Sequence, residues 1–343
     1  MHSIAFLLRR GSNGPRPLDL IRGKAPQHPL WSTGVILTVT PNLALDITYT
    51  LDEVRWQDTN RVRRAHHQCG GKGVNVARVL DTLGYPTLVT GLVGGATGQQ
   101  ARTELAEAGL AERLHPIAGQ TRRTVVVADQ AAGGATVFNE AGPYVTPAEW
   151  SGFLMAYEEL LGGASGPVEA VVLAGSLPLG VRDDAYAMLG MLATARGLPV
   201  VLDTSGPALL AGVAAGPAVV KPNRDELAVT TGEADPITGA ERLCSLGAQA
   251  VVCSLGEDGV LALSAAGAWR AYPPERLAGN PTGAGDAAVA GLVSGLVDGV
   301  EWPERLRRAV ALSAAAVLSD VAGGFDDAAY DRFRSSVRVE EVR

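Results

Sequence analysis

The stretch Asn280-Pro281-Thr282-Gly283-Ala284-Gly285-Asp286, followed by the apolar run 287–293, organises the rest of the chain. Its Pro-Thr pair ends the preceding segment, its Gly-Ala-Gly segment forms a turn without bulky side chains, and the apolar run is typical of a buried helix. The first N–H groups of a helix have no partner within the helix, and the helix dipole favours an anion beside them. The stretch therefore predicts an anion-binding turn at the start of a buried helix.

Asp286 is the one acidic side chain in this turn. A carboxylate at an anion site is costly unless it has a task. One hypothesis is that Asp286 accepts the proton of a hydroxyl group that attacks a phosphate held nearby. The alternative is an ordinary glycine-rich loop, in which Asp286 is an acid in the first turn of a helix. These seven residues alone leave both interpretations open.

The composition limits the class of protein. A length of 343 residues with 47% hydrophobic content allows a large core, in one α/β domain with an appendage or in two domains. The net charge of −7 argues against nucleic acid as the main partner. No apolar run approaches the ~20 residues that cross a bilayer. The three cysteines have no metal-type spacing, which favours a reduced, cytoplasmic protein.

The first 33 residues differ in composition from the rest of the chain. They combine prolines, glycines and arginines with one short apolar run, a composition that packs poorly. We predict a disordered N-terminal extension over 1–33. A start codon placed too early and a targeting peptide are two alternatives for its origin.

A second glycine-rich helix start lies at Gly70-Gly71-Lys72-Gly73-Val74-Asn75. Val76, Val79 and Leu80 follow at helical spacing. The Gly-x4-Gly-Lys-Ser/Thr pattern of a Walker A loop is absent. Glycines let a ligand approach the backbone closely, so the pattern favours a phosphate-binding or polyol-binding loop over a structural turn.

Strand and helix patterns alternate regularly from residue 146 onward. This alternation predicts a parallel sheet that is covered by helices on both faces. Polar residues just past the strands would collect along one edge of that sheet, namely Ser176, Asp203, Lys221 and Asn223. Segments 47–54 and 62–68 alternate apolar and polar residues instead, which is typical of a small sheet with one exposed face.

Together these motifs resemble the ribokinase-like (PfkB) carbohydrate kinases over roughly 35–325. The resemblance rests on four motifs in order: Gly70–Asn75, Lys221–Glu226, Ser254–Gly259 and Gly283–Asp286. It implies a three-layer α/β/α fold with a mostly parallel central sheet and a small antiparallel β lid. It also implies a single kinase domain over 34–330, with the lid at about 47–68 and 121–138 and a charged, weakly ordered tail at 331–343.

Further matches resemble the 1-phosphofructokinase and tagatose-6-phosphate kinase branch of that family. They are the segments 38–42, 60–62, 121–122, 139–143 and 280–281, together with Asp46. The branch implies a substrate that already carries a phosphate: fructose 1-phosphate, fructose 6-phosphate or tagatose 6-phosphate. Thr40-Pro41-Asn42-Leu43 departs from the usual Thr-x-Asn-Pro order, and Arg123 stands where a neutral residue is common. Both departures concern the choice of sugar.

The resemblance also implies a role for each site residue. Asp286 would be the general base, and the N–H groups of Gly283, Ala284 and Gly285 would form the anion hole. Sugar hydroxyls would bind to Asp46, Asn75 and the backbone of Gly70 and Gly71. Lys72 and Arg122 would bind the phosphate that the sugar carries, with Arg61 or Arg123 in support.

ATP is the implied phosphoryl donor. The implied nucleotide-binding residues are Lys221, Asn223, Ser254, Gly256 and Gly259. Asn223 and Glu226 would organise Mg²⁺ through water, which suits an ion that usually keeps several waters. A homodimer through the β lid is the implied assembly.

Two alternatives stay open at this stage. One is a ribokinase-type or nucleoside-type kinase that acts on an unphosphorylated acceptor. The other is a non-catalytic sugar-phosphate sensor on the same fold, against which Asp286, Asn223 and Glu226 argue.

Overall fold

The computed structural model describes residues 34–132, 134–277 and 279–342. The extension predicted for 1–33 lies outside the described residues. Within the described part of the chain, no helix has both the length and the apolar character that crossing a membrane requires.

A ten-stranded sheet forms the centre of the fold, in the order β14-β13-β12-β11-β10-β9-β8-β1-β4-β5. The strands that pair in parallel are β1 (Val35–Thr40), β4 (Thr87–Val93), β5 (Glu112–Pro116), β8 (Val168–Ala174), β9 (Val200–Asp203), β10 (Val219–Val220) and β11 (Ala250–Ser254). The strands that pair antiparallel at one edge are β12 (Val260–Ser264), β13 (Gly267–Tyr272) and β14 (Arg338–Glu341). The prediction of a mostly parallel central sheet is confirmed.

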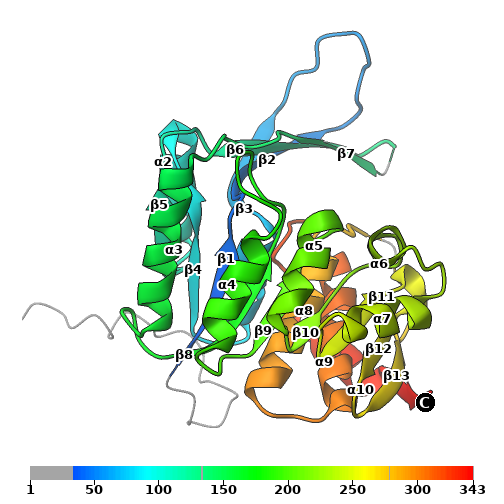
Figure 1. Ribbon diagram of the computed structural model, residues 1–343. Helices are drawn as coiled ribbons and strands as arrows, with labels where there is room; N and C mark the ends of the chain where they lie inside the picture. Colours follow the sequence, from blue (N-terminus) through cyan, green and yellow to red (C-terminus); the bar gives the residue numbers. More distant parts are fainter. Residues whose placement is uncertain (1–33, 133, 278, 343) are drawn as a thin grey trace, which may run out of the picture. The chain divides into compact units, whose positions relative to one another are not determined.

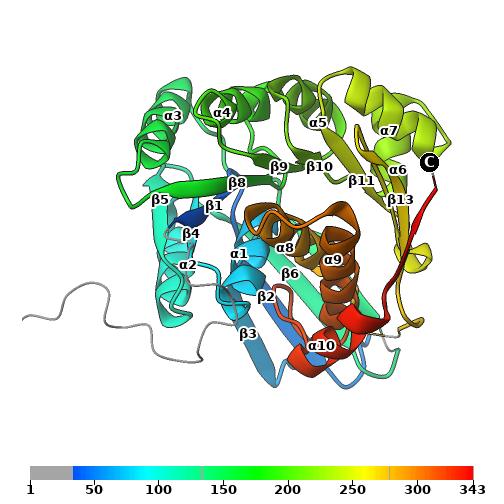
Figure 2. The same ribbon diagram turned by 90° about the horizontal axis from the view of Figure 1, so that it is seen from below.

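Helices cover both faces of this sheet (Figures 1 and 2). One face carries α1 (Lys72–Thr82), α8 (Ala284–Val297), α9 (Trp302–Val317) and α10 (Asp327–Ser336). The other carries α3 (Pro147–Leu161), α4 (Ala185–Thr194), α5 (Gly206–Gly212) and α7 (Pro236–Ser245). Small residues let α8 and α9 approach closely, since a Cβ on Gly291 would lie 2.6 Å from the Cα of Ala309. The three-layer α/β/α prediction is therefore confirmed.

A separate four-stranded sheet forms the lid, in the order β3-β2-β6-β7. Its strands are β2 (Ala44–Leu51), β3 (Arg64–Gly70), β6 (Arg122–Asp129) and β7 (Gly134–Asn139). The outer pairs are antiparallel, whereas β2 and β6 pair in parallel. Every residue of β7 is exposed, and the β2–β3 loop extends beyond the strands (Figure 1). Helix α2 (Gly95–Glu107) packs beside β2 and β3.

The expectation of a weakly ordered tail at 331–343 is corrected by the structure. Residues 327–341 form α10 and the edge strand β14, which pairs with β13. Tyr330 and Phe333 are buried in the core, and Arg334 donates to Glu304 of α9. The many charges of the segment lie on the exposed side of an amphipathic helix, which makes its sequence look like a tail.

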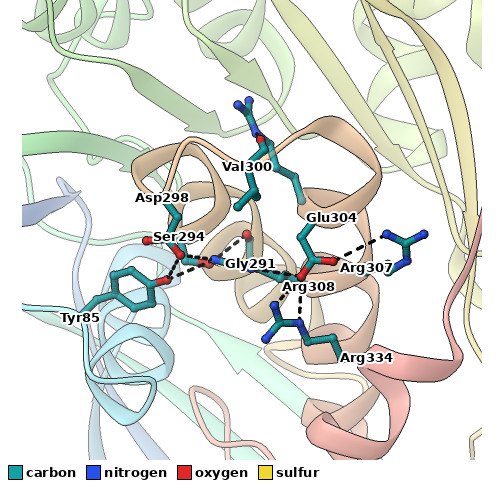
Figure 3. Close-up of polar contacts among 10 residues, drawn as sticks. Tyr85, Gly291, Ser294, Asp298, Val300, Glu304, Arg307, Arg308 and Arg334 are labelled. Carbon is teal, nitrogen blue, oxygen red and sulfur yellow. Dashed lines mark hydrogen bonds and ion pairs between the residues drawn. The ribbon is translucent and has the colours of Figure 1, made fainter. Parts of the chain in front are cut away.

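A network of ionic and polar contacts joins the far ends of these helices (Figure 3). Asp298, at the C-terminal end of α8, accepts from Arg308 at 2.6 Å and from the hydroxyl of Tyr85 at 2.7 Å. Glu304 pairs with Arg307, Arg308 and Arg334. The network fixes α8 to α9 and α10 at the end that is remote from Asp286.

Candidate active site

The polar residues that follow parallel strands meet at one edge of the central sheet. Thr40 ends β1, Asp203 ends β9, and Lys221 directly follows β10. The helix starts of α1 and α8 lie at the same edge, because Asn75 of α1 contacts Asp286 of α8. The carboxyl ends of parallel strands are where α/β proteins place their ligands.

The start of α8 is an open turn. Gly283 adopts a left-handed backbone with φ of 86°, and no side chain caps the helix. The N–H of Ala284 donates to the carbonyl of Pro281 at 3.2 Å, whereas no acceptor among the described residues serves the N–H groups of Gly283 and Gly285. The φ of 86° favours glycine here, and a Cβ on Gly283 would also make a tight contact, at 3.1 Å from the Cα of Ala322. The turn thus offers free N–H donors at a helix start.

Asp286 lies in the first turn of α8 and is buried, with 7% of its surface exposed. Its Oδ2 accepts from Nδ2 of Asn75 at 2.8 Å. Burial and the nearby charge of Asp203 raise the pKa of Asp286 to about 7, although Asn75, Lys72 and Lys221 act in the opposite direction. A carboxylate with a pKa near neutrality suits a general base.

Asp203 lies between two lysines. Its Oδ1 accepts from Nζ of Lys72 at 3.0 Å and is 3.6 Å from Nζ of Lys221. Its Oδ2 is buried and has no hydrogen-bond partner among the described residues. Burial lowers the pKa of Lys72, but the carboxylates of Asp203, Glu226 and Asp286 outweigh burial and leave that pKa raised. Lys72 is therefore cationic, and both lysines lie near enough to Asp286 for their charges to act on it.

The sugar-binding residues predicted from the sequence gather where the lid meets α1. Asp46 of β2 lies over Gly70, since a Cβ on that glycine would come within 1.9 Å of the Asp46 carboxylate. Burial raises the pKa of Asp46, while Thr124 and Arg122 lower it. Arg122, at the start of β6, donates to the carbonyl of Asn42 at 3.1 Å and to that of Glu140 at 3.4 Å. Burial lowers the pKa of Arg122.

Arg122 and Arg123 differ in environment although they are adjacent. Successive strand residues point to opposite faces. Arg122 is partly buried and reaches Asn42 below the lid, whereas the side chain of Arg123 is exposed. Of the two, Arg122 is the one on the Asp46 side.

Two further residues of this part of the site were given no role by the sequence analysis. Asn42 is 5% exposed, and its Nδ2 donates to Ser176 Oγ at 3.1 Å. Its Oδ1 has no hydrogen-bond partner within the described part of the chain. Asp203 was noticed only as a polar residue at a strand exit. The only sequence feature that marks both residues is their position just after a buried strand. Many loop residues share that feature, so it does not identify a site residue.

Asn223 and Glu226 form a capping box at the start of α6 (Arg224–Thr231). Asn223 Oδ1 accepts from the N–H of Glu226 at 2.7 Å, and Glu226 Oε2 accepts from the N–H of Asn223 at 2.8 Å. Their spacing is therefore explained by helix capping alone. One carboxylate oxygen of Glu226 stays outside the box. Among the described residues, no group of three acidic, histidine or cysteine side chains could hold a metal ion.

The predicted nucleotide loop lies beside this helix start. Ser254 ends β11, and its N–H donates to the carbonyl of Pro222 at 3.0 Å. Gly256 and Gly259 have φ of 64° and 87°, and a Cβ on Gly259 would lie 2.0 Å from the carbonyl oxygen of Ala271. Arg224 of α6 pairs with Asp258 of the loop at 3.2 Å.

The structure thus brings together most of the predicted site residues. It places the two cations predicted for the phosphate of the sugar, Lys72 and Arg122, in different parts of the site. Lys72 pairs with Asp203 on the Asp286 side, whereas Arg122 has its partners below the lid. These partners favour different tasks for the two residues.

Comparison with known proteins agrees with this geometry. Residues 40–326 match the family described as pfkB family carbohydrate kinase. The chain belongs to the pfkB family of carbohydrate kinases. Both signature regions of the site, at Gly70–Asn75 and Gly283–Asp286, lie within the matched segment, and the family predicted from the sequence is confirmed.

Solved structures of pfkB kinases are similar over nearly their whole length. Phosphofructokinase-2 from Escherichia coli in complex with potassium is 26% identical with a TM-score of 0.81, over 88% of this chain and 98% of that one. A possible 1-phosphofructokinase from Thermotoga maritima is 27% identical with a TM-score of 0.81, over 90% and 100%. Ribokinase from Arabidopsis thaliana complexed with ribose and ATP is 20% identical with a TM-score of 0.67, over 88% and 99%, and supports the fold alone.

Another structure of the Escherichia coli enzyme is its complex with fructose-6-phosphate. A further one is the structure of its tetrameric inhibited form. With its family and these relatives established, this pfkB protein is an ATP-dependent sugar kinase.

Proposed function

We propose that this kinase transfers the γ-phosphoryl group of ATP to a ketohexose that already carries a phosphate. The candidates are fructose 1-phosphate, fructose 6-phosphate and tagatose 6-phosphate. The observation that carries the proposal is the buried carboxylate of Asp286, with its pKa raised to about 7, beside the uncapped start of α8. The fructose-6-phosphate bound by the Escherichia coli relative supports the substrate class.

Asp286 takes the proton of the attacking sugar hydroxyl. Asn75 donates to the carboxylate at 2.8 Å and so orients it. The free N–H groups of Gly283 and Gly285 stabilise negative charge on the transferring group, since donors fixed in advance need no reorganisation during the reaction. The N–H of Ala284 joins them only if its bond to Pro281 opens.

The acceptor sugar lies between the lid and the start of α1. Asp46 accepts hydrogen bonds from sugar hydroxyls, and the side-chain-free surfaces of Gly70 and Gly71 let the sugar approach the backbone. Arg122 binds the phosphate that the sugar already carries, with Arg61 as a secondary contact. The supporting role expected for Arg123 is not proposed, because that side chain is exposed on the opposite face of the lid sheet. Closure of the lid excludes water and so limits hydrolysis of ATP.

ATP and Mg²⁺ belong on the other side of Asp286. Lys221, Asn223, Ser254, Gly256 and Gly259 surround the proposed nucleotide site. The carboxylate oxygen of Glu226 that lies outside the capping box and the amide of Asn223 fit an Mg²⁺ ion that is held through its waters. When bound, Mg²⁺ supplies charge neutralisation for the phosphate oxygens.

We propose a homodimer through the β lid as the assembly. The exposed strand β7 supports it, because Val137 and Phe138 are 44% and 53% exposed there. We propose the cytoplasm as the compartment, which the free cysteines Cys69, Cys244 and Cys253 support. Sedimentation of wild-type protein against a Phe138→Glu variant tests the dimer, since a charge at the interface would yield monomers.

A panel of acceptors tests the substrate class. Purified protein with Mg-ATP is assayed by ADP release on the three hexose phosphates, on free hexoses, on ribose and on nucleosides. We expect turnover on at least one hexose phosphate and a much lower kcat/KM on free sugars. Turnover on free sugars or nucleosides with none on hexose phosphates would contradict the proposal.

An unphosphorylated acceptor is the second candidate. It is favoured by one observation, namely that the Arg122 guanidinium already donates to two backbone carbonyls. If this candidate holds, Arg122→Ala leaves the KM for the acceptor nearly unchanged.

A further inference from the structure

The distribution of lysine in this chain is unusual. The sequence contains only three lysines, although lysine and arginine together number 29. Among the described residues, Lys72 and Lys221 are the only lysines, and both lie against the same carboxylate, that of Asp203. Everywhere else in the described part of the chain, a side chain with a permanent positive charge is arginine.

The three residues come from different elements. Asp203 ends β9, Lys221 follows β10, and Lys72 begins α1, at a distance of 131 residues from Asp203 along the chain. Asp203 is 1% exposed and Lys221 is 4% exposed. Buried charged groups require partners, and the Asp203 carboxylate lies 3.6 Å from Nζ of Lys221.

The two lysines lie beside the anion-binding turn. A Cβ on Gly285 would be 3.6 Å from Nζ of Lys221, so this ammonium group borders the free N–H donors at the start of α8. The charges of both lysines also act on Asp286. An ammonium group is a compact point charge with three donors, whereas a guanidinium is a wide planar fork. Here two compact ammonium groups lie against the same carboxylate oxygen, Oδ1 of Asp203.

Asp203 is not arranged as a purely structural residue would be. Its Oδ1 serves both lysines, while Oδ2 is buried without any partner among the described residues. An unpaired buried oxygen costs stability, and buried polar groups are normally satisfied. This arrangement fits a role in which the Asp203 carboxylate holds the two lysine ammonium groups in position for a ligand.

We propose that Asp203 is a positioning residue that holds the ammonium groups of Lys72 and Lys221 at the transferring phosphoryl group. This inference rests on the proposed phosphotransferase function and deepens it. It differs from the sequence-based expectation for Lys72, because it assigns that residue to the transferring group and leaves the phosphate of the sugar to Arg122. The two lysines flank the group during transfer, and their charges offset the charge that develops on its oxygens.

The first test needs no enzymatic activity. Acetic anhydride at low concentration acetylates deprotonated amines, and mass spectrometry reads each of the three lysines separately. In Asp203→Asn the pKa of Lys72 loses its main raising influence, so Lys72 is acetylated at least tenfold faster than in the wild type. The reaction at Lys24 is the internal reference. Asp184→Asn, which alters an exposed ion pair with Arg182, is the control and leaves the rate at Lys72 unchanged.

The second test is the pH profile of kcat. The charged or hydrogen-bonding groups that face Asp286 are Asp203 from β9, Lys72 and Asn75 from α1, and Lys221 after β10. Burial and Asp203 raise the pKa of Asp286, so removing the Asp203 charge in Asp203→Asn lowers that pKa. We therefore expect the acidic limb of the profile to move to lower pH, together with at least a tenfold fall in the maximal kcat.

Lys72→Met is the second variant, because Asp203→Asn risks misfolding at a buried site. Under the proposal, kcat falls at least tenfold while the KM for the sugar phosphate changes less than threefold. A raised KM with unchanged kcat would overturn the proposal and return Lys72 to the phosphate of the sugar. In the double variant Asp203→Asn with Lys72→Met, the fold-loss in kcat must be smaller than the product of the two single fold-losses, because Asp203 acts in part through Lys72.

The outcomes separate this inference from the proposed function. If no hexose phosphate is a substrate, the proposed acceptor is wrong, yet acetylation of Lys72 still tests the Asp203 contact. An unchanged acetylation rate in folded Asp203→Asn would overturn the inference even in an active kinase. A raised Mg²⁺ requirement with an unmoved acidic limb would overturn it also, since Asp203 would then serve the metal ion.

Discussion

Carboxylate groups lie at both ends of helix α8, but those at one end are paired with arginines and the one at the other end is buried with a raised pKa. At its C-terminal end, Asp298 and Glu304 pair with Arg308, Arg307 and Arg334 in the network of Figure 3. At its N-terminal end, Asp286 is buried with its pKa raised to about 7, and polar atoms of neighbouring residues lack hydrogen-bond partners among the residues that the structure describes.

The difference teaches how to separate stability from function in this fold. Paired carboxylates and guanidinium groups stabilise the contact between helices, so their loss costs folding free energy. A buried carboxylate with a raised pKa does the reverse, because it is retained at the expense of stability. Asn75 Oδ1 and Asp203 Oδ2, which have no hydrogen-bond partner in the described part of the chain, belong to the second kind of region. Such groups are expected where substrates complete the hydrogen bonding.

The largest expected effect comes from removing the base. Asp286→Asn keeps the size of the side chain and still accepts from Asn75, but it cannot take a proton. We expect kcat to fall by about 10²–10⁴-fold, the usual contribution of a general base, with a modest change in the KM for ATP. Steady-state kinetics on the best hexose phosphate measures both. A near-normal kcat would rule out Asp286 as the base.

The opposite end of α8 is tested by Asp298→Ala. This change leaves Arg308 buried without its closest carboxylate and removes the acceptor of Tyr85. Breaking a buried pair from one side costs about 3–5 kcal/mol, so we expect a loss of that order in the free energy of unfolding in urea. The kcat of the folded variant stays within twofold of the wild type. Asp184→Ala, at an exposed pair, is the control and changes the free energy of unfolding far less than Asp298→Ala does. A large loss of kcat in folded Asp298→Ala would contradict the claim that the Asp298 end of α8 serves stability and not catalysis.

Arg122→Ala distinguishes a phosphorylated acceptor from an unphosphorylated one. Loss of hydrogen bonds to a charged group costs about 1.5–3 kcal/mol, so the KM for the sugar phosphate rises about tenfold to a hundredfold. Arg123→Ala is the matched control, since its side chain is exposed on the opposite face. Equal effects in the two variants would mean that the phosphate does not lie on the Asp46 side of the lid.

The smallest effect is the pH dependence of the wild type. Asp286 must be deprotonated to act as a base, and its pKa is raised to about 7. We therefore expect kcat to rise with pH through about 7 and to level off above it. An acidic limb near 4, the ordinary value for an aspartate, would show that Asp286 is not held in a buried, charged environment during catalysis.

Local sequence patterns predicted much of this molecule. The alternating strands and helices and the open turn at Gly283 follow from apolar periodicity and glycine placement, which act over short distances. The Asn223/Glu226 pair was predicted as an Mg²⁺ site, and the same spacing also makes a capping box, which sequence alone does not distinguish. Helix α10 was missed because its charges conceal the buried Tyr330 and Phe333.

The pairing of Asp203 with two lysines could not be predicted in the same way. It depends on three elements that meet at the edge of the sheet, and on side-chain directions that spacing does not encode. The separation of Lys72 from Arg122 has the same origin. Burial, which raises the pKa of Asp286, is likewise a property of the packed helices α1 and α8 rather than of the Gly-Ala-Gly-Asp segment.

The thermal unfolding of Asp286→Asn as a function of pH tests the central claim most directly, because it needs no knowledge of the substrate. A carboxyl group whose pKa is higher in the folded state contributes stability below its unfolded pKa, and this contribution is lost as pH rises through about 7. At about 1.4 kcal/mol per pH unit, ionisation of Asp286 then costs up to about 4 kcal/mol above neutrality.

We predict that Asp286→Asn, although inactive, unfolds at a higher temperature than the wild type at pH 8, and that this advantage shrinks toward pH 5. An inactive variant that is less stable than the wild type at pH 8 would contradict this prediction, since Asp286 would then stabilise the fold as Asp298 does.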